Sequence, residues 1–184
     1  TLRHYIEAFS VDWVKERGIL WTGTAWNSFN TTFTIALISS LPTAAIGILT
    51  AYLLTRHKFR GKNAFEFGTM LSFAIPGSVI GVSYVFAFNV PPLELTGTGI
   101  ILVIAFVFRN MPVGVRAGIA AMNQLDPHLD EASSTLNASS SQTFRNVILP
   151  LLKPAITASL VFSFVRAMTA ISAVIFLVSA NYDL

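Results

Sequence analysis

The residues able to do chemistry are few in this chain, and they form no catalytic set. There are no cysteines, and His4, His57 and His128 lie far apart without the spacing of metal ligands. The long apolar stretches offer Arg, Asn, Ser and Thr, with Glu66 as their one acid, so paired catalytic groups at membrane depth are lacking. We therefore expect neither a catalytic site nor a metal site, and we do not expect an enzyme.

The most unusual polar residues are Arg109 and Asn110, near the middle of the apolar stretch 98–122. A charged side chain at the centre of a bilayer costs at least about 2.5 kcal/mol on insertion scales. Arg109 precedes Leu125, at the inner end, by about 16 residues, or ~24 Å of helix, which is too far to snorkel. Two interpretations remain open: Arg109 and Asn110 line a translocation pathway, or Arg109 pairs with a neighbouring helix. Arg166 lies near the outer end of its stretch and is expected to snorkel.

The loop 126–146 predicts a helix, a turn and a second helix. Asp126 is a capping residue for the first helix, and Asn137 stands where that helix needs a left-handed residue to stop. Ser139 and Gln142 have the spacing of a capping box that opens the second helix. The apolar positions share one face: Leu129, Ala132 or Ser133, and Leu136 in the first helix, and Phe144 and Val147 in the second. We expect both helices to lie on the inner membrane face.

The elements that position these residues are membrane spans. Apolar residues make up 53% of the 184 residues and charged residues only 11%, so the net charge of +3 does not suggest nucleic acid. Stretches long enough to cross a bilayer are predicted at 31–55, 64–88, 98–122 and 147–169. Gly77 and Gly81 form a small-xxx-small pair suited to close helix packing. The expected fold is an all-α, multi-pass integral membrane protein in the lipid bilayer.

Orientation follows from the basic link between the first two stretches. That link, RHKFRGK, holds five basic residues in seven if its histidine is counted, and such links remain cytoplasmic. Counting crossings then puts 126–146 inside, and 89–98 and the tail from Ile171 outside. Residues 1–30 read as an external amphipathic segment or the remnant of a linker. The tail is too short to span, and with no initiator Met or signal peptide we expect a fragment.

Two short motifs in the inner loop stand at a fixed distance: Glu-Ala-Ser at 131–133 and Leu-Pro at 149–150, with Asn137 between them. This arrangement resembles the EAA loop of binding-protein-dependent ABC transporter permeases. That pattern reads Glu-Ala-Ala, three residues, Gly, nine residues, Ile, one residue and Leu-Pro. Here Ser133 replaces the second Ala, Asn137 the Gly and Val147 the Ile. The resemblance implies that these residues couple the chain to an ATPase: Asp130, Glu131, Ala132, Ser133, Asn137, Leu149 and Pro150.

Several longer strings resemble the branch of that family that imports ferric iron. They are TLRHYIEAF, IPGSVIGVSYVFAFN, FRNMPVGVRAGIAAMNQLDPHLDEAS and SFVRAMTAISAVIFL. The resemblance implies the transmembrane domain of a type I ABC importer, the second of two tandem copies, without its last helix, over residues 31–184. Sister branches for sulfate, thiamine, polyamines and phosphonates share this scaffold and remain alternatives.

The resemblance also implies partners. These are a cytoplasmic ABC ATPase dimer, a periplasmic or extracellular substrate-binding protein and a second permease domain, tandem or dimeric, in the bacterial inner membrane. ATP and Mg²⁺ belong to the ATPase, and no cofactor is expected in this chain, because RGKN at 60–63 lacks the other residues of a phosphate loop. A secondary transporter or channel is the alternative from another class, but it has no reason to carry the capped two-helix loop.

Overall fold

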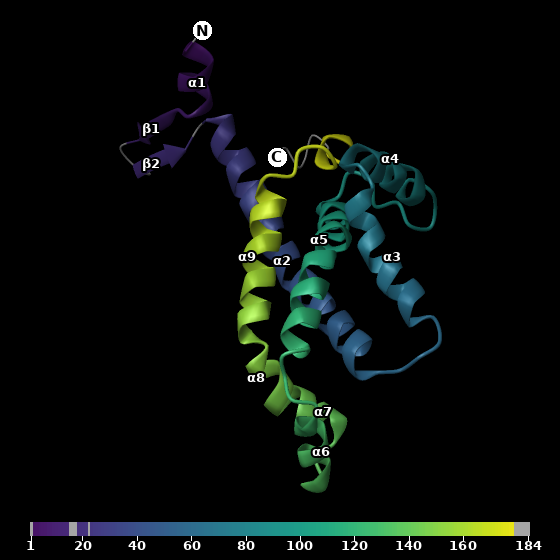
Figure 1. The fold of residues 1–184 in the computed structure, drawn as a ribbon. Coiled ribbons are helices and arrows are strands. Elements are labelled where there is room, and N and C mark those ends of the chain that lie inside the picture. The colour runs from purple at the N-terminus through teal and green to yellow at the C-terminus, as the bar shows by residue number, and fades with distance from the viewer. Residues whose placement is uncertain (1, 15–17, 22, 179–184) are drawn as a thin grey trace.

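A computed structural model describes residues 2–14, 18–21 and 23–178 of the chain (Figure 1). Its elements in chain order are α1 (Arg3–Ala8), β1 (Val11–Val14), β2 (Gly18–Trp21), α2 (Thr24–Arg56), α3 (Lys62–Ala74), α4 (Gly77–Phe88), α5 (Gly99–Met122), α6 (His128–Thr135), α7 (Ser140–Thr143), the π-helical turn η1 (Phe144–Ile148), α8 (Leu149–Leu151), α9 (Lys153–Met168) and the 3-10 turn η2 (Val174–Phe176). The expected all-α fold is confirmed for everything described after residue 21.

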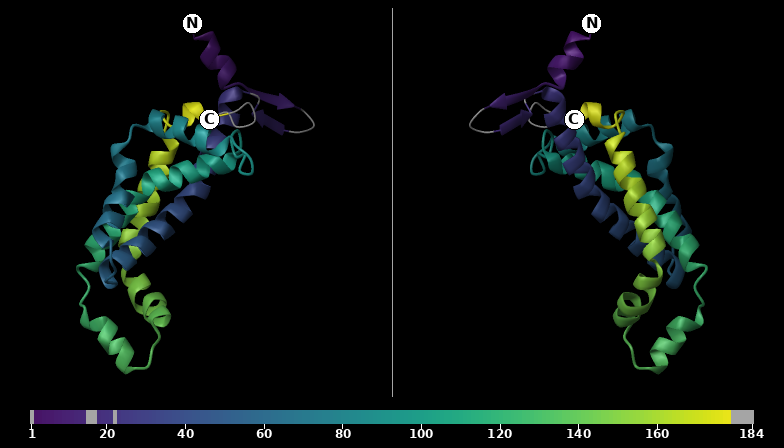
Figure 2. Two further views of the ribbon diagram at one scale, coloured as in Figure 1. Left: turned by 90° about the vertical axis from the view of Figure 1, so that its right-hand side faces the viewer. Right: turned by 90° about the vertical axis from the view of Figure 1, so that its left-hand side faces the viewer.

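The N-terminal segment, predicted to be an external amphipathic segment or the remnant of a linker, has secondary structure of its own. It contains α1 and a short antiparallel hairpin, in which Val11 of β1 lies opposite Trp21 of β2. The first long helix, α2, then begins at Thr24, earlier than the predicted start at residue 31. The hairpin projects from one end of the molecule, away from the helical bundle (Figure 2).

Three helices, α2, α5 and α9, form the centre of the molecule (Figure 1). Glycines let α2 and α5 approach at backbone distance: a Cβ added to Gly47 would lie 3.0 Å from Cα of Gly114. A Cβ added to Gly118 would lie 2.5 Å from Cβ of Ala51. Gly47 with Ala51, and Gly114 with Gly118, are therefore two small-xxx-small pairs facing each other, the packing device of membrane helices. Sequence reasoning identified only Gly77 and Gly81, and it missed this crossing.

Several buried hydroxyls of α2 are satisfied within their own helix, whereas that of Ser159 on α9 has no hydrogen-bond partner among the described residues. On α2, Ser39 donates to the carbonyl of Ala36 at 3.1 Å, and Thr43 donates to the carbonyl of Ser39 at 2.6 Å. These bonds leave few polar groups in need of a partner at depth. Large apolar side chains such as Leu41 and Val161 remain 62% and 58% exposed on the outside of the bundle, as expected for surfaces that face lipid.

Two of the four predicted spans are bent. The stretch 64–88 consists of α3 and α4, and the chain bends by 108° between them. Pro76 explains the break, because it cannot donate a helical hydrogen bond and it pushes the preceding Ile75 out of the α region, to ψ 131°. A second bend, of 71°, separates the segments Ser140–Leu151 and Lys153–Met168. By length and apolar composition, α2 and α5 suffice to cross a membrane, and four spans result if each bent pair counts as one.

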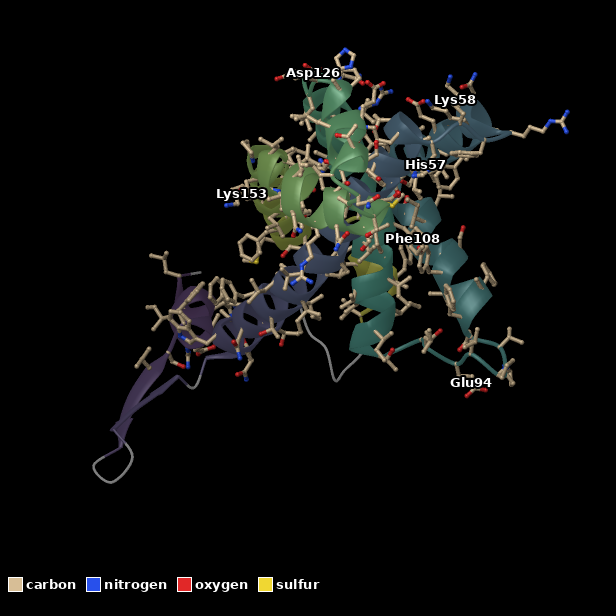
Figure 3. All side chains as sticks on the ribbon, turned by 90° about the horizontal axis from the view of Figure 1, so that it is seen from below. His57, Lys58, Glu94, Phe108, Asp126 and Lys153 are labelled. Atoms are coloured by element: carbon tan, nitrogen blue, oxygen red, sulfur yellow. The ribbon has the colours of Figure 1, made fainter. Side chains whose placement is uncertain are left out.

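The two segments assigned to the inner side lie at one end of the bundle. The link 57–61 and helices α6 and α7 are at the lower end in Figure 1, whereas α4 and η2 are at the upper end. Figure 3 views the molecule from below, with Asp126, Lys58, His57 and Lys153 on the upper side of the view and Glu94 at its lower right. The tail, expected to be re-entrant, interfacial or a helix cut short, forms η2 against α4, and residues 179–184 lie outside the described range.

Candidate functional site

The loop between α5 and α9 has the predicted helix, turn and helix. Asp126 accepts a hydrogen bond from the backbone N–H of His128 at 2.9 Å, and α6 begins at His128. The helix stops at Asn137, which has a φ of 58° and is the only non-glycine residue with a positive φ in the described ranges. The N–H of Ala138 reaches back to the carbonyl of Ser133 at 3.1 Å, and that of Asn137 to Ser134 at 3.0 Å. This is a Schellman motif with Asn in the position usually held by Gly, as the sequence predicts.

The second helix opens with the predicted capping box. The hydroxyl of Ser139 accepts from the backbone N–H of Gln142 at 3.3 Å, and the Gln142 side chain accepts from the backbone N–H of Ser139 at 2.8 Å. These reciprocal bonds satisfy two of the N–H groups that a helix leaves free at its start. The turn and both helix ends are thus held by bonds within the loop itself.

A π-helical turn, η1, joins the loop to the membrane helices. The N–H of Leu149 bonds to the carbonyl of Phe144, five residues back, just before Pro150, which has no N–H. The wider turn shifts the buried face by one residue. Ile148 is therefore fully buried, and Val147, predicted to face the core, is only half-buried. Ile148 packs with Ile48, Ala51 and Met122 at the inner end of the bundle.

An ion pair ties the loop to the first long helix. Oδ2 of Asp130 lies 3.3 Å from Nε of Arg56, the last residue of α2, and the two side chains are 36% and 15% exposed. Nε and Nη2 of Arg56 are buried and have no hydrogen bond within the described residues. Asp130 therefore supplies the negative charge beside a half-desolvated guanidinium. Sequence reasoning used Arg56 only as one of the basic residues that set orientation, and nothing local links it to Asp130.

The opposite face of α6 has no partner within the described chain other than its own side chains. Glu131 has a side chain that is 77% exposed and lies 3.0 Å from Nδ1 of the equally exposed His128. Ala132 is exposed and Leu136 is 83% exposed, whereas Ser133 is buried at 8%. The expected apolar stripe is thus divided: Ser133 faces the protein, and Leu136 faces outward. Two chemically distinct faces result, one fixed to α2 and one free.

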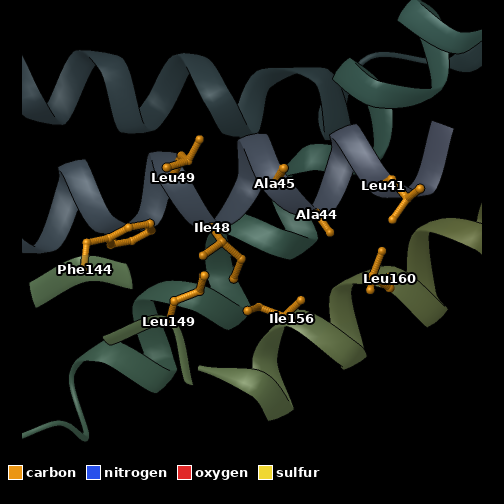
Figure 4. A pocket seen from close by; sticks show the side chains of 9 residues that line it. All are labelled: Leu41, Ala44, Ala45, Ile48, Leu49, Phe144, Leu149, Ile156 and Leu160. Atoms are coloured by element: carbon orange, nitrogen blue, oxygen red, sulfur yellow. The ribbon is translucent and has the colours of Figure 1, made fainter. Parts of the chain in front are cut away.

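Leu149 and Pro150 lie where the loop meets α9. Pro150 is exposed, and Leu149 lines an apolar groove of about 400 Å³ between α2 and α9 (Figure 4). The other lining residues are Leu41, Ala44, Ala45, Ile48, Leu49, Phe144, Ile156 and Leu160. The groove offers shape and apolar surface only, so it has no chemistry for a charged solute.

Arg109 and Asn110 are neighbours on α5, but the structure does not bring their side chains into one site. Asn110 is buried in the bundle at 3% exposure. Arg109 is half-buried, with Nη1 next to Gly77 at the start of α4, and it lines a cavity with Arg166. Arg166 is exposed, as snorkelling predicts, but its guanidinium also lies over the rings of Phe73 and Phe162, at 5.5 and 5.9 Å. The shared cavity was not foreseen, because the two arginines are 57 positions apart.

No group of three or more His, Cys, Asp or Glu side chains that could hold a metal ion occurs in the ranges 2–14, 18–21 and 23–178. The acids that are described lie mostly on the hairpin segment, the loops and α6. The described residues therefore offer two features: an exposed face of α6 at the inner end, suited to docking, and the positive charge of Arg109 within the bundle.

Comparisons with known proteins agree with this arrangement. Residues 43–181 match the model of a family described as "binding-protein-dependent transport system inner membrane component". The chain is 54% identical over 157 residues to the putative ferric transport system permease protein FbpB 1 of Haemophilus influenzae, covering 85% of this chain and 25% of that protein. It is 52% identical to the ferric transport system permease protein FbpB of Actinobacillus pleuropneumoniae, covering 85% and 23%.

A more distant relative belongs to a different transport system. The sulfate transport system permease protein CysT of Salmonella typhimurium is 31% identical over 160 residues, covering 82% of this chain and 58% of that protein. The chain therefore spans about a quarter of the length of the two ferric relatives and little more than half of the sulfate relative.

Proposed function

The chain belongs to the binding-protein-dependent transport system inner membrane components, and from that premise we propose that it forms part of the permease of an ATP-driven ferric iron importer. The observation that carries the substrate is the gap between 54% identity to a ferric permease and 31% identity to a sulfate permease. As a multi-pass permease component, the chain is not an enzyme and needs no cofactor of its own. ATP and Mg²⁺ are assigned to a partner.

The proposed coupling uses the two faces of α6. The outward face, with Glu131, Ala132 and Leu136, docks on a cytoplasmic ABC ATPase dimer. The inward face holds Asp130 against Arg56 at 3.3 Å, so a displacement of α6 is passed to α2. Asn137 and the capping box make the loop rigid enough to transmit that displacement, because its bonds are internal.

The same displacement reaches the other helices through η1 and α8. Ile148 and Leu152, both fully buried, flank Leu149 and Pro150 and pack against α2 and α5. We propose that rocking of these helices opens the path alternately to the two sides, with a soluble binding protein delivering iron to the outer mouth. A second permease domain, tandem or dimeric, completes the path. Arg109 is our candidate for a residue on it, and the buried Asn110 for one that holds the bundle.

The experiment that tests this proposal changes Glu131 to Lys in the full-length subunit, assembled with its ATPase and binding protein in liposomes. Loss of one charge-assisted hydrogen bond weakens docking by about 1.5–3 kcal/mol, and reversal of the charge adds repulsion. ATP-driven uptake of ferric iron should therefore be lost while membrane insertion is retained. The matched control is Gln124→Lys, an exposed position just before α6, which should transport normally.

Three outcomes would contradict the proposal. Normal uptake by Glu131→Lys would remove α6 as the coupling element. Uptake of sulfate in place of iron would overturn the substrate while leaving the importer assignment intact. Uptake that needs no ATP would indicate a secondary transporter or channel.

A further inference from the structure

A cavity of about 330 Å³ lies beside the segment that follows α9, and its lining combines two arginines and two hydroxyl-bearing side chains with the apolar Ala170 and Ile171. Arg109 enters it from the middle of α5, and Arg166 enters from the last turn of α9. Thr169 and Ser172, in the segment that follows α9, complete its polar lining. The cavity therefore joins helices that are far apart in the sequence, and the segment after α9 lies at the end of the bundle opposite α6 and α7 (Figure 1).

The charge in this cavity is not compensated by the described chain. None of the ion pairs formed by the described residues includes Arg109 or Arg166. Nη1 of Arg109 is buried and has no hydrogen-bond partner there. A desolvated N–H of a guanidinium without an acceptor costs free energy, so the geometry calls for a negatively charged acceptor.

Because Gly77 has no side chain, the Arg109 guanidinium fits beside the first turn of α4. A Cβ at Gly77 would collide with Nη1 of Arg109 and with Oγ of Ser172, so a side chain at this position would close the site. The N-cap residue of α4 is Pro76, which provides no side-chain hydrogen bond to the free N–H groups of that turn. The positive end of the α4 dipole thus adds to the charge of the arginines.

Arg166 is held in place without using its hydrogen bonds. Its guanidinium lies over Phe73 and Phe162, so the cation–π contacts fix its plane while its N–H groups remain free to donate. The two arginines line one cavity, and guanidinium groups donate paired hydrogen bonds to oxyanions. Ser172 adds a hydroxyl donor at the same point.

We propose that this cavity binds a small oxyanion, of the chemistry of phosphate or sulfate, between Arg109 and Arg166. The oxyanion accepts from the buried Nη1 of Arg109, from the Arg166 guanidinium and from the Ser172 hydroxyl. This site goes beyond the proposed function, because its chemistry is the same whichever solute the permease carries. Its anion is either free in solution or the phosphate of a lipid headgroup.

The test uses the full-length permease complex, purified in a phosphate-free maltoside detergent, with radiolabelled inorganic phosphate and sulfate as probes at constant ionic strength. We expect saturable binding that Arg109→Gln weakens at least tenfold and that Arg109→Lys restores in part. The matched control is Arg116→Gln, an exposed arginine on the same helix outside the cavity, which should bind as the parent does. Size-exclusion elution confirms folding, and if Arg109→Gln fails to fold, Ser172→Ala should show a severalfold loss.

Added phosphatidylglycerol distinguishes the two sources. Displacement of the radiolabelled anion by this lipid, but not by a neutral glycolipid, identifies the headgroup as the ligand, and no displacement identifies the free anion. Absence of saturable binding, or equal affinity in the parent and in Arg109→Gln or Ser172→Ala, overturns the proposal. In that case a carboxylate from another part of the full-length protein neutralises the arginines.

Discussion

Neutralising Asp130 tests whether the coupling loop is fixed to the membrane helices by charge. In Asp130→Asn, the guanidinium of Arg56 stays in place but loses the carboxylate 3.3 Å away. Removing one partner of a fully buried pair costs about 3–5 kcal/mol, and a fully exposed pair contributes about 0–1 kcal/mol. With side-chain exposures of 15% and 36%, this pair lies between those limits, and we expect a loss of about 2 kcal/mol.

The assay is thermal unfolding of the purified full-length subunit, combined with a double-mutant cycle. Within the full-length subunit, the unfolding transition of this domain should shift by about 2–4 °C per kcal/mol, the value for 150–250 residues, so that in Asp130→Asn it should occur about 4–8 °C lower. Arg56→Gln removes the other partner, and the double variant closes the cycle, with an expected coupling free energy of about 1–2 kcal/mol. Glu131→Gln is the control, because its side chain is 77% exposed and its neutralisation should change stability by less than about 0.5 kcal/mol.

Additive effects in the cycle, within about 0.3 kcal/mol, would show that Asp130 and Arg56 do not interact. Equal melting temperatures for Asp130→Asn and Glu131→Gln would also contradict the ion pair, because the two acids would then have equivalent surroundings. Transport assays give a second test of Asp130→Asn. This variant should still hydrolyse ATP, but it should take up less iron per ATP hydrolysed.

Three further predictions concern the turn, the helix crossing and the orientation. Asn137→Ala should lower stability by about 1–2 kcal/mol, because Ala is strained at φ 58°, whereas Asn137→Gly should not, and equal melting of both variants would contradict this. Gly118→Ala should cost about 1–3 kcal/mol, because its Cβ would lie 2.5 Å from that of a facing alanine, whereas Gly68→Ala, with open space around its Cβ, should be neutral or stabilising in the same urea or SDS titration. A single cysteine at Lys58 should react with an impermeant reagent only from the cytoplasm and one at Glu94 only from outside, and the reverse pattern would invert the topology.

Features that depend on a few neighbouring residues were predictable from the sequence. The capping box at Ser139, the left-handed Asn137 and the cap at Asp126 all follow from bonds that span two to five residues. The apolar stretches follow from the cost of unsatisfied polar groups in lipid, which acts on each segment separately. The residues of the EAA-like loop all lie within one continuous segment, so their spacing indicated the family without knowledge of the fold.

Features that join distant segments required the tertiary structure. Pro76 was visible in the sequence, but the 108° bend that it permits is set by what α4 packs against, including η2. Asp130 pairs with Arg56, and Arg109 lines one cavity with Arg166. No local sequence pattern connects the charges in either pair. The residue types and the periods along the chain therefore determined what this protein is built from and which family it belongs to. Only the close crossing of α2 and α5 and the break after α3 decided which charges meet, because burial and Coulomb attraction depend on distances in space and not along the chain.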